Sequence, residues 1–251
     1  LPMTDRPRPR PGDLAGDDAD AAQTTVANQL AAELSRRIVE GRYAPGASLR
    51  EIPLAEEFGV SRSSVREALR ILERDGVARI EPHRGASVTR LTTDELIEIY
   101  RVRTVLLGLA MALGCEHRSD EDVAWLTKQL AAMKAAGRHA DDRAGPLHAT
   151  ISAAMATRVI RLAGSRRLEQ LLTQMSTQIA RYTRLGLSSR ERRGQSLETW
   201  RQLVDALARR DAAAAERLGR KLVTDTLSFA LRRIAGLDAD PGVRGTALTG
   251  A

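Results

Sequence analysis

Apolar residues near the start of the chain recur at helical spacing. Val26, Leu30, Leu34 and Ile38 follow one another every four residues, and this stripe predicts an amphipathic helix. Gly41 lies just beyond the stripe and suits the C-terminal cap of that helix. Order is therefore expected to begin near residue 23.

Two shorter helices are predicted next. Pro53 suits the first turn of one helix, and Ser61 is a natural N-cap for the following one. In that later helix, Val65, Ala68, Leu69 and Leu72 form an inward stripe, and Gly76 ends it.

The stretch "VARIEPHRGASVTRL" then changes the pattern. Its apolar residues predict two short β segments around a turn from Pro82 to Gly85. Three helices followed by a small β-hairpin describe a winged helix-turn-helix, which we assign to residues 23–91.

Strand patterns disappear after Leu91, and long helical patterns follow. Six helices joined by short loops predict an antiparallel bundle over residues 92–236, so the fold class is mainly α. The predicted helices span residues 93–117, 120–136, 147–163, 165–185, 196–210 and 211–234.

Both ends of the chain lack an apolar pattern. Residues 1–22 are rich in Pro, Gly, Arg and Asp and are predicted to form a disordered tail, either solvated or touching DNA phosphates through the Arg-Pro repeat. Residues 237–251 are Gly-rich and are predicted to form a flexible tail.

Composition narrows the function classes. The net charge is +7 and nearly all basic residues are arginines, which suits phosphate binding but also fits a GC-rich genome. One cysteine and the lack of a membrane-length apolar run predict a cytoplasmic protein with no membrane role. No phosphate loop, nucleophile elbow or HExxH motif is present, so we expect no enzyme activity.

The third predicted helix carries a column of like charges at i+4 spacing, formed by Arg62, Arg66, Arg70 and Arg74. Neighbouring like charges at this spacing destabilise a free helix. Recognition helices present their N-terminal residues to bases in the major groove, where arginine binds guanine bidentately. We therefore predict that Arg62 and Arg66 contact DNA, whereas Arg70 and Arg74 fit a solvated face balanced by nearby glutamates, with Glu67 and Glu73 pairing with Arg70.

The predicted hairpin tip "HRG" has a complementary role. Gly85 permits a positive φ, and Arg84 is placed to enter the minor groove, where negative potential attracts arginine. His83 is either a phosphate contact or a solvated turn residue. Arg50, just ahead of the second helix, is predicted to contact backbone phosphate.

The motif "GVSRSSVREAL", within about 65 residues of similar pattern, strongly resembles the winged-helix domain of GntR-family transcriptional regulators. The resemblance implies that the Ser-Arg-Ser run, the following arginine and the wing tip contact operator DNA. The full predicted DNA-binding set is Arg50, Ser61, Arg62, Ser63, Ser64, Arg66, His83, Arg84 and Gly85.

The helical part resembles the FCD-type sensor domain of the FadR subfamily through "EIYRVRTVLLGLA", "LAGSRRLEQLL" and "SLETWRQLVDALARRDAAAAERL". Six helices suggest its VanR-like branch. Many relatives bind a divalent metal there through one Asp and three His. The matching positions are Ser152, Ala156, Trp200 and Leu222, so we predict that the metal site is lost and that no cofactor is present.

These replacements leave two readings of the domain open. Trp200 and Leu222 make its centre apolar, which favours an apolar effector contacting Trp200 and Ser152. Arg103 matches an inward-facing arginine of the family and would bind an anionic head group. Alternatively, Trp200 fills the former cavity and nothing binds.

The combined reading is a homodimeric regulator, most simply a repressor, that binds an inverted-repeat operator in double-stranded DNA and is released by a small effector. The alternative is an architectural DNA-binding protein that responds to no effector.

Overall fold

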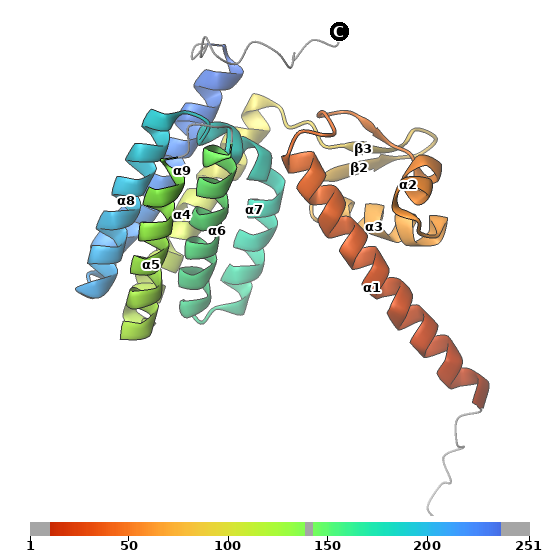
Figure 1. Ribbon diagram of the computed structural model, residues 1–251, viewed down its shortest axis with the longest axis horizontal. Helices are drawn as coiled ribbons and strands as arrows, with labels where there is room; N and C mark the ends of the chain where they lie inside the picture. The colour runs from red at the N-terminus through yellow and green to blue at the C-terminus, as the bar shows by residue number, and fades with distance from the viewer. Residues whose placement is uncertain (1–10, 139–142, 237–251) are drawn as a thin grey trace, which may run out of the picture. The chain divides into compact units, whose positions relative to one another are not determined.

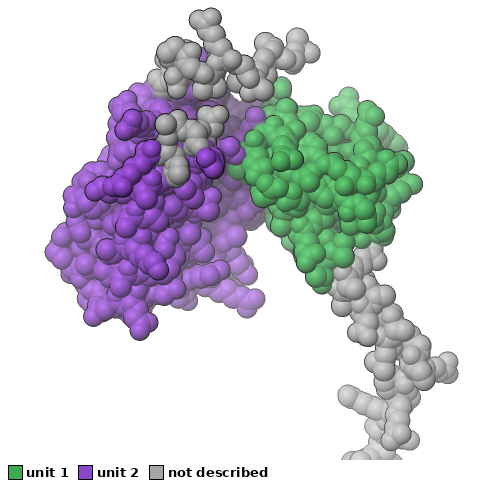
Figure 2. All heavy atoms as spheres, in the orientation of Figure 1, with its two compact units in different colours: residues 1–90 green, residues 91–251 purple. Residues whose placement is uncertain are grey.

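The computed structural model describes residues 11–138 and 143–236, with side chains from Thr25 onward. The chain divides into two units, residues 1–90 and residues 91–251, which Figure 2 shows in different colours. The predicted flexible tail at 237–251 lies outside the described residues, as do residues 1–10.

Three helices and a small sheet form the first unit (Figure 1). The helices are α1 (Pro11–Val39), α2 (Glu51–Phe58) and α3 (Arg62–Arg74). Both α1 and α2 pack against α3. The predicted inward stripe of α3 is confirmed, because its apolar side chains join those of α1 in one buried cluster.

The start of α1 corrects one prediction. Residues 11–22, assigned above to a disordered tail, form the first part of this helix, which begins at Pro11. The apolar stripe starts only at Val26, and three of its members, Leu30, Leu34 and Ile38, are in the buried cluster.

Local signals at both ends of α3 are confirmed. The Ser61 side chain accepts a hydrogen bond from the backbone N–H of Ser64, which makes it the predicted N-cap. Gly76 has φ +74°, a left-handed conformation that turns the chain away from the helix axis into β2.

The sheet contains one strand more than expected. The predicted hairpin consists of β2 (Ala78–Glu81) and β3 (Gly85–Val88). A two-residue strand, β1 (Ser48–Leu49), pairs with the other edge of β3, so the strand order is β1-β3-β2 and both pairings are antiparallel. A strand of this length carries no alternation that a sequence pattern could reveal.

The second unit is a bundle of six helices over its described residues, as predicted (Figure 1). Its most extensive contact joins α4 to α9. None of the described helices is both long and apolar enough to cross a membrane. The bundle comprises α4 (Thr93–His117), α5 (Asp120–Ala136), α6 (Ala144–Leu162), α7 (Arg166–Gly186), α8 (Arg190–Ala208) and α9 (Ala212–Ile234).

Two bundle helices begin earlier than predicted. α6 starts at Ala144, three residues early, and α8 starts at Arg190, six residues early. The reading of α8 failed because "SSRERRGQ" looks like a polar loop containing a glycine. In the structure Ser189 caps the helix by accepting a hydrogen bond from Arg192 N–H, and Gly194 lies inside it.

Most helices of the bundle begin after a residue whose side chain caps the first turn. A serine, threonine or aspartate oxygen accepts a bond from a backbone N–H of the first turn, which satisfies a donor that has no partner within the helix. The capping residues are Thr92, Ser119, Ser165, Ser189 and Asp211, the last as predicted.

Close helix approach depends on glycine. A Cβ atom at Gly114 of α4 would lie 2.5 Å from the carbonyl oxygen of Val159 and 2.7 Å from its Cγ1, on α6. The backbones of α4 and α6 therefore meet at a distance that only glycine permits. By contrast, a Cβ atom at Gly194 would meet no atom within 4 Å.

We predict that Gly114→Ala lowers the free energy of unfolding by about 1–3 kcal/mol, because the methyl group forces α4 away from α6. The matched control is Gly194→Ala at an exposed position of α8, which should raise the free energy of unfolding by about 0.5–1 kcal/mol through helix propensity. Urea denaturation monitored by circular dichroism measures both. Equal shifts in the two variants would contradict the close contact.

Candidate nucleic-acid interface and sensor core

Two arginines project from the start of α3. The side chains of Arg62 and Arg66 are 62% and 53% exposed. Arg66 binds Glu51 bidentately, with Nε at 3.0 Å from Oε1 and Nη2 at 2.9 Å from Oε2. Arg62 Nη2 lies 3.7 Å from the same carboxylate. One carboxylate thus holds both arginines beside the first turn of α3.

Glu51 is a site residue that the sequence reading missed. It is the first residue of α2, where an acid is already explained by the helix dipole, so nothing in the sequence pointed toward Arg66. The hydrogen bond from Arg66 holds the pKa of the Glu51 carboxyl below its usual value. Glu51 is therefore ionised at neutral pH and orients the Arg66 guanidinium.

The remaining arginines of the column also have acids nearby. Arg70 has the expected glutamate beside it, whereas the acid beside Arg74 is an aspartate. Arg70 lies 3.4 Å from Glu67, and Arg74 Nε lies 3.6 Å from Asp75. Both pairs are exposed to solvent, where such pairs contribute little stability. The like-charge column is thus divided into two pairs. Arg62 and Arg66, near the start of α3, share Glu51, whereas Arg70 and Arg74 each have a separate acid.

The serine run is only partly exposed. Ser61 and Ser63 are at the surface, with their hydroxyl oxygens 2.8 Å apart. Ser64 is only 4% exposed, and its hydroxyl lies 2.9 Å from Ser61 Oγ. Its predicted direct DNA contact is therefore corrected, because Ser64 is turned inward and supports the cap of α3.

The wing tip is strained and open. His83 has φ +64° and Gly85 has φ +77°, so two residues of the turn are left-handed, and only Gly85 was foreseen. The Arg84 side chain is 84% exposed, with a loose contact of 3.4 Å to Glu81. Arg50 is also exposed, at the N-cap position of α2.

The centre of the bundle joins two of the predicted effector residues. Trp200 is 1% exposed, and its Nε1 donates a 2.9 Å hydrogen bond to Ser152 Oγ, from α8 to α6. Leu222 is buried and Ala156 is partly buried. Within the described part of the chain, no group of three or more His, Cys, Asp or Glu is arranged to hold a metal ion.

Arg103 makes its contacts elsewhere. Its Nη1 donates to the carbonyl oxygen of Leu172 at 3.1 Å and to Ser176 Oγ at 2.8 Å, both on α7. Burial lowers the pKa of its guanidinium. The structure therefore uses Arg103 to join α4 to α7, and its hydrogen bonds do not include the Ser152–Trp200 pair.

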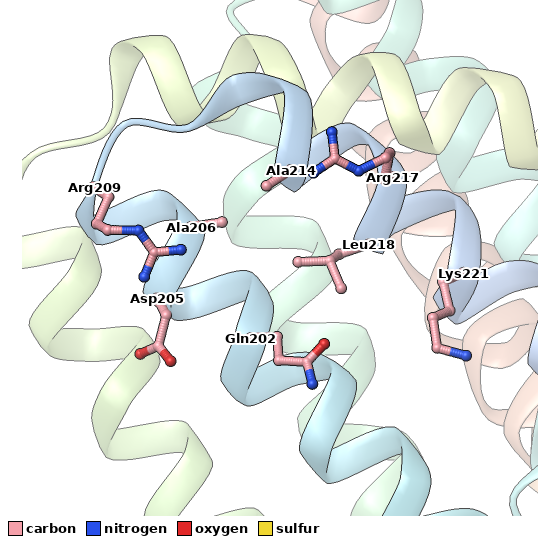
Figure 3. A pocket seen from close by; sticks show the side chains of 8 residues that line it. All are labelled: Gln202, Asp205, Ala206, Arg209, Ala214, Arg217, Leu218 and Lys221. Atoms are coloured by element: carbon pink, nitrogen blue, oxygen red, sulfur yellow. The ribbon is translucent and has the colours of Figure 1, made fainter.

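A groove of about 450 Å³ lies between α8 and α9 (Figure 3). It contains none of the predicted effector residues. Its polar lining has three cationic side chains and one acid, Asp205, which already pairs with Arg201. The lining residues are Gln202, Asp205, Ala206, Arg209, Ala214, Arg217, Leu218 and Lys221.

Comparison with known families agrees with this geometry. The sequence pattern of the "FCD domain" matches residues 98–225, and that of "Bacterial regulatory proteins, gntR family" matches residues 26–88. The chain belongs to the GntR family. Its FCD domain fits the FadR subfamily, as the motifs indicated.

Individual relatives match to different extents. An uncharacterized HTH-type transcriptional regulator, YdhC of Bacillus subtilis, is 41% identical over 98 residues, which are 39% of this chain and 44% of that protein. The chain thus spans less than half of that relative. A "Probable D-xylose utilization operon transcriptional repressor" of Paenarthrobacter nicotinovorans is 29% identical over 220 residues, 86% of this chain and 94% of that one.

The fold is also found among solved structures. Escherichia coli McbR/YncC aligns with a TM-score of 0.72 at 21% identity, over 83% of this chain and 98% of that one. The mainly helical architecture with a small sheet is therefore confirmed as that of a known regulator.

We predict that Ser152→Ala lowers the free energy of unfolding by about 1–3 kcal/mol, because the buried indole N–H of Trp200 loses its acceptor. Urea denaturation followed by tryptophan fluorescence measures the change. Ser228→Ala is the matched control, since its exposed hydroxyl binds only Thr224 O on its own helix. Similar midpoints for the two variants would show that the Ser152–Trp200 bond is unimportant.

Proposed function

We propose that this protein is a sequence-specific DNA-binding transcriptional regulator. The observation that carries the proposal is the exposed pair Arg62 and Arg66 at the start of a capped α3, in a unit that also exposes Arg84 on a hairpin. An α-helix fits the major groove, and an arginine on a hairpin suits the narrow minor groove. Family membership supports the same reading.

Arg66 is the proposed base-reading residue. Its guanidinium already makes two parallel hydrogen bonds to Glu51, and guanine O6 and N7 offer a similar pair of acceptors. Ser61, Ser63, Arg50 and the wing tip are proposed to bind phosphate, which positions α3 without reading sequence.

The proposed operator is an inverted repeat bound by a homodimer. Support for a dimer comes from α4, where Val102, Val105 and Leu109 leave large apolar side chains exposed on one stripe at i, i+3 and i+7. A two-fold dimer presents two recognition helices to two half-sites. Repression is the proposed sign of regulation, because the relative matched over most of its length is named as a repressor.

The sensor domain is proposed to act without a metal ion, since Ser152, Ala156, Trp200 and Leu222 replace the expected ligands. Release by a small apolar effector remains one version of this function. The buried Ser152–Trp200 bond favours the other version, in which the indole fills the former cavity and the protein binds DNA independently of such an effector.

We expect Arg66→Ala to weaken binding to a selected operator by about 1–3 kcal/mol and to relax base preference at one position in each half-site. Fluorescence anisotropy on operators selected from a random DNA library measures both effects. Arg74→Ala, which removes the same charge farther along α3, should change affinity less and leave base preference intact. Unchanged preference in Arg66→Ala would assign base reading to another element.

We expect Leu109→Asp to raise the dimer dissociation constant about tenfold or more, because a carboxylate in an apolar interface loses its hydration. Sedimentation velocity measures the change. Leu147→Asp is the control, since Leu147 on α6 is similarly exposed, 41% against 46% for Leu109. An equal loss of dimer in both variants would argue against the α4 interface.

A further inference from the structure

The groove between α8 and α9 has no role in the function proposed above (Figure 3). Its volume of about 450 Å³ is within the range found for small-molecule sites in proteins. Its apolar lining consists of Ala206 from α8 and of Ala214 and Leu218 from α9. The groove therefore has both the size and some of the apolar surface that a small organic molecule requires.

The charged lining of the groove is mainly cationic. Arg209 lies at the C-cap of α8, whereas Arg217 and Lys221 lie one turn apart on α9. The acid of the lining is Asp205. Cationic side chains from both helices thus border the same space, as Figure 3 shows.

The two arginines of the groove differ from their neighbours on the same helices. Arg201 on α8 and Arg220 on α9, which do not line the groove, each pair with a glutamate on their own helix. Within the described part of the chain, neither the Arg209 nor the Arg217 guanidinium has a hydrogen bond or an ion pair with another residue. Their N–H donors are therefore available to a ligand.

The other charged groups of the lining already have partners. Lys221 Nζ lies 2.8 Å from a carboxylate oxygen of Asp225, and the Asp205 carboxylate lies 2.8 Å from Nη1 of Arg201. The groove is thus left with two positive charges, those of its two unpaired arginines. Arginine keeps its proton in proteins, so these charges are present at every pH at which the protein is folded.

We propose that the groove binds a phosphate group, as the free ion or as part of a small phosphorylated molecule. Phosphate oxygens accept paired N–H groups from guanidinium, which suits a site with two unpaired arginines. A phosphate monoester carries about two negative charges near pH 7, which balances Arg209 and Arg217. The apolar lining then contacts the organic part of an ester. This site is independent of the proposed DNA binding, because all of its residues lie in the second unit.

The test uses the purified full chain and titration calorimetry at constant ionic strength. The probes are sodium phosphate and glucose 6-phosphate, with glucose and sodium acetate for comparison. Arg209→Gln and Arg217→Gln each remove one of the two unpaired charges. Arg190→Gln is the matched control, because Arg190 is an exposed arginine at the other end of α8 and does not line the groove. All three substituted side chains are exposed, so each variant should keep the wild-type Tm, which scanning calorimetry checks.

Both phosphate compounds should bind the wild-type protein and Arg190→Gln equally well. They should bind Arg209→Gln and Arg217→Gln about tenfold more weakly, because each variant loses a charge-assisted hydrogen bond. Tighter binding of glucose 6-phosphate than of phosphate would identify an ester as the ligand, and equal affinities would identify the free ion.

Three results would overturn the proposal. The first is the absence of binding by both phosphate compounds at millimolar concentrations. The second is equal binding by all four proteins, which would place the phosphate outside the groove. The third is binding of glucose or acetate as tight as that of phosphate, because neither carries the two charges that the groove lacks.

Discussion

The contact between α4 and α9 is the constraint around which the sensor bundle is arranged. A Cβ atom at Gly219 of α9 would lie 2.6 Å from Met111 Cγ, and one at Gly108 of α4 would lie 2.8 Å from Arg220 Cγ. Glycine on each helix therefore leaves room for a side chain of the other at one level of the contact. Protein interiors are too densely packed to absorb an added methyl group cheaply, so the spacing of α4 and α9 at this level depends on these glycines.

Local chemistry explains why much of this fold was predictable. Three features depend only on residues that are close together in the sequence, and each is found in the structure. They are the apolar stripe from Leu30 to Ile38, the cap at Ser61 and the cap at Asp211. Features that depend on distant partners were missed. β1 exists because Ser48 and Leu49 pair with β3, almost forty residues later in the sequence.

In the sensor core too, residue types were informative, whereas contacts between residues far apart in the sequence were missed. The residue types at Ser152 and Trp200 led to the prediction of an altered centre. Their hydrogen bond joins positions 48 residues apart, so only the folded chain reveals it. Arg192 was overlooked because its neighbours in sequence are polar, which suggested a loop. Arg192 is 1% exposed and bonds to Thr226 on α9, and a one-dimensional pattern does not record such a neighbour.

The pair formed by Glu51 and Arg66 has a consequence for selectivity. In the DNA binding proposed above, Arg66 has to leave a bidentate carboxylate before it can reach a base. Glu51 is thus an internal competitor that sets a threshold for every DNA sequence the protein meets. In that binding, a site offering two well-placed acceptors replaces both hydrogen bonds to Glu51, and a site offering one replaces only one of them. Discrimination between DNA sequences then depends on the difference between two bidentate geometries of Arg66. One is formed with a DNA base, and the other with Glu51 of the same chain.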